Sequence, residues 1–231
     1  CGVLPTPGVA YITRLRGFQA GVVVSASHNL FEDNGIKLFG GRGDKLDDAM
    51  EAAIEQRMAQ PQACVPSRQL GQGWRLPSAA GLYVDFCQRS LPPAVGLQGL
   101  RIVIDAAHGA CHEVATEVFE RLGAQVVAVG SAPTGININE GVGATCPQHL
   151  ADAVCHHHAD VGIALLENAV FGQKPVDIVQ HVREMVGPFL DIVQKLRREV
   201  LMDAAGPEIG RMETRARGTL VEDHQLLAFL E

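Results

Sequence analysis

Short apolar runs alternate with segments of helical periodicity along most of this chain, which is the pattern of an α/β fold. Runs rich in Val and Ile predict strands over residues 20–25, 36–39, 101–105, 125–129 and 159–164. Apolar positions at helical spacing predict helices over residues 6–16, 44–58, 78–90, 112–122 and 147–158. Because strand and helix alternate after residue 100, we expect parallel strands joined by right-handed crossovers there, and mixed or parallel sheets with flanking helices overall.

Pro and Gly residues without periodicity fill residues 63–77, which predicts a linker. It would separate one domain over residues 1–62 from a second over residues 78–166.

Two helix starts carry capping signals. Thr6 followed by Pro7 predicts that the first helix begins with a threonine N-cap. The tail over residues 167–231 has apolar stripes at helical spacing, and the capping-box spacing of Thr219 and Glu222 predicts a helix that runs on to the end. We therefore expect a helical tail after the α/β part.

Composition narrows the function classes. The chain has 231 residues, 47% of them hydrophobic, and a formal net charge of −7 with no basic run, which disfavours a nucleic-acid surface. Its six cysteines include no CxxC pair, which favours reduced thiols. No apolar run is long enough to cross a membrane and no signal-peptide pattern is visible, so we expect a cytoplasmic protein with no membrane or nucleic-acid partner.

The candidate chemistry follows the first predicted strand. Val22–Val24 leads into a loop that carries the hydroxyl of Ser27, the imidazole of His28 and the amide of Asn29, and the ammonium of Lys37 follows. The end of a strand is the usual place for chemistry in an α/β protein.

The ordered string is more specific than its members. The chain resembles the phosphoserine loop of the α-D-phosphohexomutases in the string Ser25-Ala26-Ser27-His28-Asn29 followed by Asn34-Gly35-Ile36-Lys37. Within that superfamily, these residues are most similar to those of the bacterial phosphoglucosamine mutases. Gly135–Asn139 and Gly143–Thr145 resemble the second domain of the same family. The resemblance covers about residues 1–165 and implies a mutase truncated at both ends, with part of domain 1 and the start of domain 2.

The resemblance implies an isomerase of carbohydrate metabolism. Ser27 would carry the phosphoryl group, with His28 and Lys37 as catalytic neighbours and Mg²⁺ bound at the phosphorylated Ser27. The substrate would be a phosphosugar, glucosamine 6-phosphate, converted to glucosamine 1-phosphate for peptidoglycan precursor synthesis. A serine hydroxyl needs such help, because it is a weak nucleophile and phosphoryl transfer depends on charge stabilisation.

Two departures from the family pattern are visible. Leu30 stands where the family usually has Pro. The family's Asp-Gly-Asp-Gly-Asp-Arg magnesium loop is replaced by Leu165–Val170, where Glu167 is the one acid and is expected to be a solvated loop residue. We therefore expect an inactive fragment with negligible turnover, or alternatively a non-catalytic gene remnant or an interaction protein that associates through its helical tail.

Other polar clusters favour structural roles. Cys146, His149 and the run 155–158 do not match a four-ligand metal site, because adjacent residues on a helix point about 100° apart. Asp105 and His108 follow a predicted strand and are expected to be scaffold of the second domain rather than catalysts.

Overall fold

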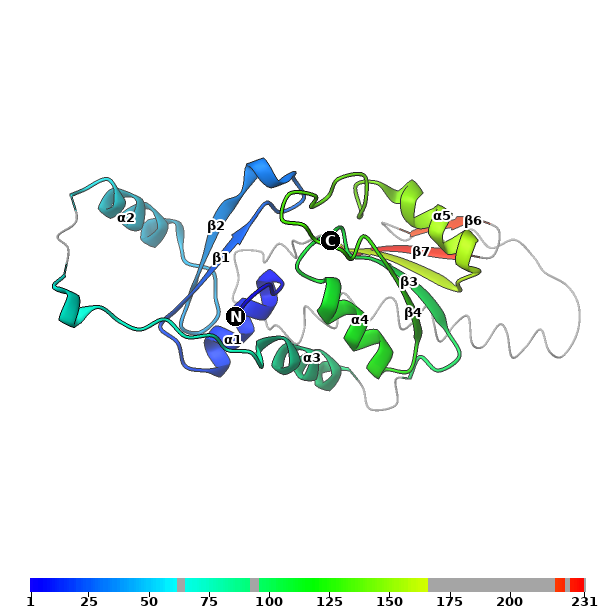
Figure 1. Cartoon of the computed structure of the whole chain (residues 1–231), viewed down its shortest axis with the longest axis horizontal. Coiled ribbons are helices and arrows are strands. Elements are labelled where there is room, and N and C mark those ends of the chain that lie inside the picture. Colours follow the sequence, from blue (N-terminus) through cyan, green and yellow to red (C-terminus); the bar gives the residue numbers. More distant parts are fainter. Residues whose placement is uncertain (62–64, 92–95, 166–218, 223–224, 231) are drawn as a thin grey trace, which may run out of the picture.

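The computed structural model describes residues 1–61, 65–91 and 96–165, and the backbone of 219–222 and 225–230 (Figure 1). Its elements, in chain order, are α1 (Thr6–Leu15), β1 (Ala20–Ser25), η1 (Phe31–Asp33), β2 (Gly35–Gly40), α2 (Asp48–Met58), η2 (Ser67–Gln69), α3 (Ala79–Ser90), β3 (Arg101–Asp105), α4 (His112–Arg121), β4 (Gln125–Val129), α5 (Pro147–His157), β5 (Val161–Leu165), β6 (Thr219–Glu222) and β7 (Gln225–Leu230). The α/β fold class predicted from the sequence is confirmed.

The first unit is a hairpin of β1 and β2 packed on helix α1. The two strands are antiparallel, with Val23 opposite Lys37. One face is buried against the helix by Ala10, Val23 and Phe39. On the other face Val22, Val24 and Ile36 are exposed by 56%, 68% and 65%. The strand predicted over residues 20–25 is therefore buried on one face only.

The start of α1 differs from the expected cap. Pro5 occupies the N-cap position and Thr6 is the first residue of the helix. Its hydroxyl is buried and has no hydrogen-bond partner among the described residues. The predicted threonine cap is wrong because the backbone turns into the helix one residue earlier, so Thr6 faces the core.

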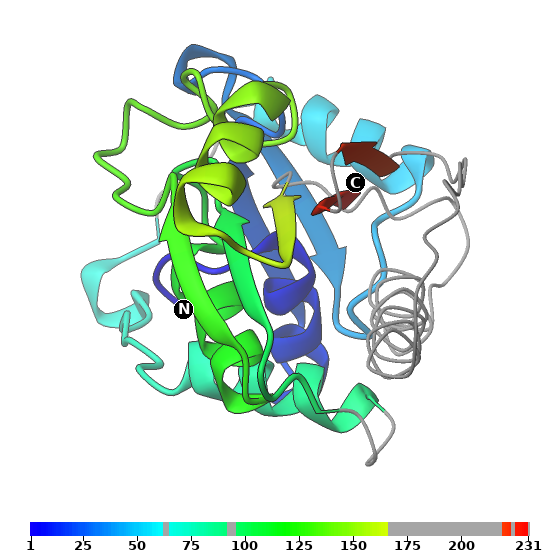
Figure 2. The ribbon, with the colours of Figure 1, turned by 90° about the vertical axis from the view of Figure 1, so that its right-hand side faces the viewer.

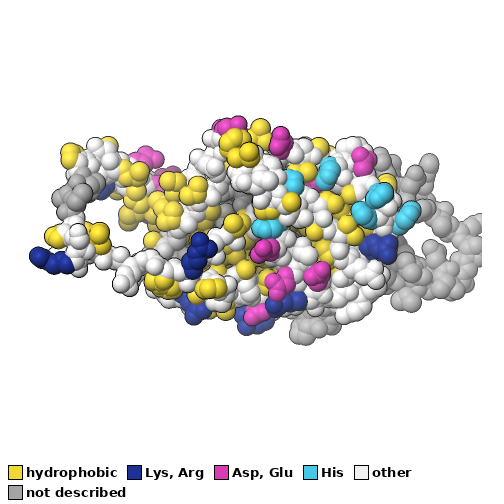
Figure 3. Space-filling view, viewed as in Figure 1, with side chains coloured by type: hydrophobic (Ala, Val, Ile, Leu, Met, Phe, Trp, Pro, Cys, Tyr) yellow, Lys and Arg dark blue, Asp and Glu magenta, His cyan; other side chains and the backbone are white. Residues whose placement is uncertain are grey.

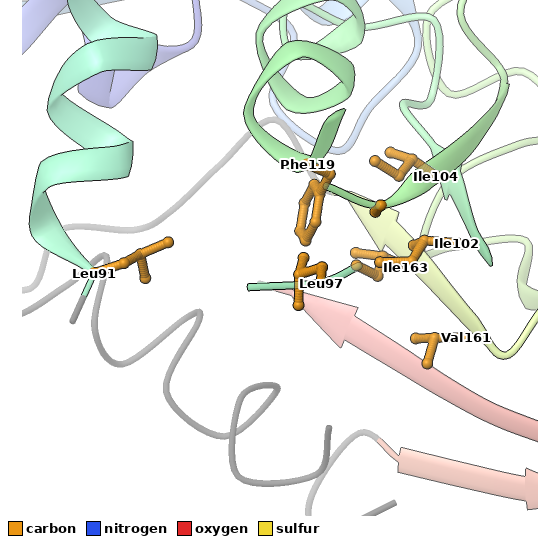
Figure 4. Packing of buried hydrophobic residues seen from close by; sticks show 8 residues of the cluster. Leu91, Leu97, Ile102, Ile104, Phe119, Val161 and Ile163 are labelled. Carbon is orange, nitrogen blue, oxygen red and sulfur yellow. The ribbon is translucent and has the colours of Figure 1, made fainter. Parts of the chain in front are cut away.

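The second unit is a parallel sheet with helices on both faces. Strand β3 pairs in parallel with β4 and with β5. Because side chains alternate along a strand, Ile102 and Ile104 pack with Phe119 of α4 on one face (Figure 4), and Val103 packs with Leu150 of α5 on the other. Figures 1 and 2 show α4 and α5 on opposite sides of this sheet.

Helix α3 joins the two units. Tyr11 of α1 stacks on Phe86 of α3 with ring centroids 4.2 Å apart, and Tyr83 lies in the same buried cluster as Val114 of α4. The two units therefore share one apolar interface built from three helices. The predicted linker lies before it, and its described part, residues 65–77, holds only the short η2 turn.

The chain returns to the sheet at its end. Strand β7 pairs in parallel with β5, and β6 pairs antiparallel with β7, giving the order β4-β3-β5-β7-β6. The helix predicted over residues 219–230 is therefore wrong. A continuous apolar run of this length fits a strand as well as a helix, and here the free edge of β5 accepts it as a strand. The helices predicted within 167–218 lie outside the described residues.

Among the helices that the structure describes, none combines the length and the apolar character that crossing a membrane requires.

Candidate functional site

The loop after β1 presents the Ser27 hydroxyl. Ser27 has a φ of +64°, a left-handed conformation that costs a non-glycine residue roughly 1–2 kcal/mol. Two hydrogen bonds hold it: the buried Ser25 hydroxyl oxygen accepts from the Ser27 backbone N–H at 3.0 Å, and the Asn29 N–H donates to the Ala26 carbonyl at 3.0 Å. The tight turn leaves Ser27 half-buried at the end of the strand.

The structure brings two of the three predicted catalytic residues into contact. The Ser27 Oγ atom lies 3.3 Å from Nδ1 of the exposed His28. Lys37 lies on β2 opposite Val23, on the face of the hairpin that α1 covers, and is half-buried. An imidazole next to a serine hydroxyl can accept its proton or donate to a phosphate oxygen.

Asn139 of the second unit, which the sequence analysis did not identify as a site residue, forms hydrogen bonds to this loop. The Asn139 side-chain Nδ2 donates to the carbonyl oxygens of Ser27, at 3.1 Å, and Asn29, at 2.7 Å. Asn139 is 7% exposed and has a φ of +58°. The resemblance drew attention to 135–139, but a contact across 112 residues of chain cannot be found from local pattern.

The loop that carries Asn139 is fixed from behind by a buried carboxylate. The Asn139 backbone N–H donates to the Ala107 carbonyl at 2.9 Å. Asp105, with no solvent exposure, accepts from the N–H groups of Ala107 at 3.0 Å and Gly143 at 2.9 Å, and from Nδ1 of His149 at 2.9 Å. The hydrogen bonds to this carboxylate join the loops of Ala107 and Gly143 to helix α5, which is what a scaffold residue would do.

Glycine is required where the two loops touch. Gly143 has a φ of +79°, and a Cβ atom there would lie 2.6 Å from the Cβ atom of Ala107. The close approach lets the Gly143 N–H reach Asp105.

A hollow of about 510 Å³ lies between the Ser27 loop and the Asn139 loop, within the ~300–1,000 Å³ typical of small-molecule sites. It is lined by His28, Asn29, Leu30, Glu32, Asp33, Asn139 and Thr145. Its lining offers amide, imidazole and hydroxyl groups together with the carboxylates of Glu32 and Asp33. On the face shown in Figure 3, the Lys and Arg side chains of the described residues are scattered among acidic ones and form no continuous basic surface.

The donor set around Ser27 does not fit the magnesium ion that the resemblance implies. Mg²⁺ prefers carboxylate oxygens, whereas the contacts described for Ser27 involve hydroxyl, imidazole and amide groups. Within residues 1–61, 65–91 and 96–165, no group of three or more His, Cys, Asp or Glu side chains could hold a metal ion. Glu167 lies outside the described residues.

Comparison with known proteins identifies relatives of the matched part. Residues 1–63 match the family described as phosphoglucomutase/phosphomannomutase, alpha/beta/alpha domain I. The phosphoglucosamine mutases of Azoarcus sp. (strain BH72) and Thiobacillus denitrificans are each 56% identical over 164 residues, which is 71% of this chain and 36% of each relative. The chain thus spans about a third of the length of these relatives.

Solved structures agree on the fold. The phosphoglucomutase/phosphomannomutase family protein of Burkholderia thailandensis superposes with a TM-score of 0.52 at 23% identity, covering 71% of this chain and 36% of that one. The putative phosphomannomutase from Thermus thermophilus gives a TM-score of 0.51 at 19% identity, covering 66% and 34%. The resemblance predicted from the Ser27 string is confirmed: over the 164 residues that match, the chain is a homologue of the phosphoglucosamine mutases, and residues 1–63 match domain I of the phosphoglucomutase/phosphomannomutase family.

Proposed function

We propose that the Ser27 loop accepts a phosphoryl group from a phosphorylated hexosamine or hexose, as the phosphoserine-bearing part of a phosphoglucosamine mutase. The observation that supports this most directly is the presentation of the hydroxyl: Ser27 stands at the end of β1, with its backbone bonded on both sides and its Oγ atom 3.3 Å from His28. A reacting group held in this way needs little reorganisation to meet a substrate in the adjoining hollow.

The transfer consists of one displacement at phosphorus. The Ser27 oxygen forms a bond to the phosphorus of a hexose bisphosphate as the bond from phosphorus to the sugar oxygen breaks. The proton leaves the Ser27 hydroxyl for His28 and is returned to the departing sugar oxygen. Phosphorylated Ser27 then transfers its phosphoryl group to the free 1-hydroxyl of glucosamine 6-phosphate, which gives the 1,6-bisphosphate. Transfer of the 6-phosphoryl group back to Ser27 leaves glucosamine 1-phosphate and restores the phosphoserine.

Compensation of the phosphate charge limits which steps of the reaction this chain can catalyse. The phosphate on Ser27 needs positive charge, and the cationic groups that the family resemblance offers for it are Lys37 of β2 and His28 once it has accepted the Ser27 proton. The donor set around Ser27 does not fit Mg²⁺. Removal of one electrostatic partner typically slows catalysis by a factor of ~10²–10³. We therefore expect Ser27 to take up phosphate while sustained isomerisation by this chain stays negligible.

The cellular setting follows from the same proposal. None of the five cysteines that the structure describes forms a disulfide. We propose a cytoplasmic chain whose substrate is a phosphosugar and whose product would feed peptidoglycan precursors.

Intact-mass spectrometry tests the proposal. The purified chain is incubated with glucose 1,6-bisphosphate, and peptide sequencing locates any added group. We expect the mass of one phosphoryl group on Ser27, and none in the Ser27→Ala variant. An unmodified wild-type chain, or a phosphoryl group at another residue, would refute the proposed function.

A further inference from the structure

We propose that Asn139 is a positioning residue: its amide, supplied by the second unit, holds Ser27 in the orientation that accepts a phosphoryl group. The inference rests on the proposed function and adds to it a residue outside the loop. It starts from one observation, that a single side chain donates to the carbonyls on both sides of His28.

The chemistry of the contact fixes the orientation of the amide. Carbonyl oxygens accept hydrogen bonds and do not donate them, so only the NH₂ end of Asn139 can face Ser27 and Asn29. The reverse orientation would direct the amide oxygen at two carbonyl oxygens. The donor is therefore Nδ2, which lies 3.1 Å from the Ser27 carbonyl oxygen and 2.7 Å from that of Asn29.

The contact restrains the reacting residue itself. Ser27 is held in the left-handed region, with a φ of +64°, and its carbonyl is one of the two acceptors. Without the amide, the serine could relax toward ordinary backbone angles, which would turn its hydroxyl. Because a trans peptide holds its N–H opposite its C=O, fixing the Ser27 carbonyl also directs the His28 N–H away from Asn139. That N–H can then donate to a phosphate on the solvent side of the loop.

Asn139 is itself held rigidly enough to do this. It is 7% exposed, and its backbone N–H donates to the Ala107 carbonyl at 2.9 Å. Ala107 is in turn bonded through its N–H to Asp105. A hydrogen-bonded path therefore runs from the carboxylate at the end of β3 to the carbonyl of Ser27.

Two variants distinguish the effect of the Asn139 side-chain amide from the effect of its backbone conformation. Asn139→Gly keeps the left-handed φ and removes the side chain. Asn139→Asp keeps the size and shape but places an acceptor against two carbonyls. Asn137→Asp is the matched control: it makes the same change two residues away, where the side chain bonds only Thr134 and Ala132 of its own loop.

The experiment follows phosphorylation of Ser27 by glucose 1,6-bisphosphate in the full chain and separates the rate constant at saturation from the half-saturating concentration. Since misplacement of a reacting group by about 1 Å can cost ~10²-fold, we expect both Asn139 variants to lower the rate constant by about that factor. For Asn139→Gly the half-saturating concentration should change less than the rate constant, because the amide that is removed donates to the loop. Asn137→Asp should stay within about threefold of wild type. Wild-type rates in Asn139→Gly would overturn the inference.

Hydrogen exchange of the backbone amides gives an independent readout. Loss of the two hydrogen bonds should speed exchange of the peptide covering 26–30 by about tenfold or more, with peptides of β3 and α5 unchanged. If the wild-type chain takes no phosphate but the exchange rises as expected, the proposed function fails and the positioning of the loop by Asn139 stands. Unchanged exchange in both Asn139 variants overturns the inference whatever the outcome for the wild type.

Discussion

The Nδ1 atom of His149 lies 2.9 Å from Oδ2 of Asp105, a carboxylate with no solvent exposure. A buried charge is costly unless it is paired and hydrogen-bonded, and here three N–H donors form hydrogen bonds to the carboxylate. His149 belongs to α5, whereas the other donors, Ala107 and Gly143, belong to two loops. Asp105 therefore joins a helix to the loops behind the candidate site.

We expect Asp105→Asn to destabilise the fold by about 3 kcal/mol, because its NH₂ group would face donors in place of an acceptor. Urea denaturation should show a lower midpoint with an unchanged slope. The control is Asp152→Asn on the exposed side of α5, where a change within about 0.5 kcal/mol is expected. Equal midpoints for the two variants would contradict the account of Asp105.

Local pattern was sufficient to predict most helices and strands of residues 1–165. The run Arg101–Asp105 forms β3, because a continuous apolar run is typical of a strand that is buried on both faces. The segment before Gly123 forms α4, because apolar residues at helical spacing are typical of a helix that is buried on one face. Local pattern failed where pairing with another strand decides whether a segment forms a helix or a strand. Residues 225–230 are apolar enough for either state, and pairing with β5 selects the strand.

The candidate site was predictable only on the side that is continuous in sequence. Ser27 and His28 are neighbours along the chain, so their contact follows from the string. The hydrogen bond from Asn139 to the Ser27 carbonyl depends on how the two units pack through α3, which no local pattern specifies. Asp105 was expected to be scaffold of the second domain, and its partners Gly143 and His149 come from later segments.

We expect His28→Ala to lower the rate of Ser27 phosphorylation by about 10²-fold or more, because proton transfer by a positioned side chain contributes ~10²–10⁴-fold. The measurement is the time course of mass increase with glucose 1,6-bisphosphate. His156→Ala, at the exposed end of α5, is a control with the same residue type and should not change the rate. A wild-type rate in His28→Ala would mean that another group takes the proton.

Leu30→Pro should stabilise the chain. Leu30 has a φ of −72°, close to the value that a proline ring imposes, and its N–H donates to no acceptor among the described residues. Proline at a compatible position typically adds ~0.4–1 kcal/mol by restricting the unfolded chain. Differential scanning calorimetry should therefore show a melting temperature higher by about 1–4 °C. A lower one would indicate that the loop needs the Leu30 side chain or its N–H.

Alkaline pH should weaken the interface between the two units. Burial raises the pKa of the Cys87 thiol to about 12, from an ordinary value of 9.0. Burial likewise raises the pKa of Tyr83, in the same cluster, well above its ordinary 10.0. Both groups stay neutral in the folded chain at pH values where the unfolded chain has ionised. The contribution of Cys87 to stability is therefore present below pH 9 and is lost as pH rises toward 12, whereas that of Tyr83 is lost as pH rises above 10.

The free energy of unfolding, measured by urea denaturation between pH 8 and pH 11, should therefore fall with pH, each group adding at most roughly 1.4 kcal/mol per pH unit. Cys87→Ala removes the first group and should move the onset of the decline from about pH 9 to about pH 10, where Tyr83 begins to contribute. Cys155→Ala, an exposed thiol on α5, should decline as the wild type does. If Cys87→Ala and the wild type decline in parallel, the Cys87 thiol is not held neutral by burial in the cluster around Tyr83.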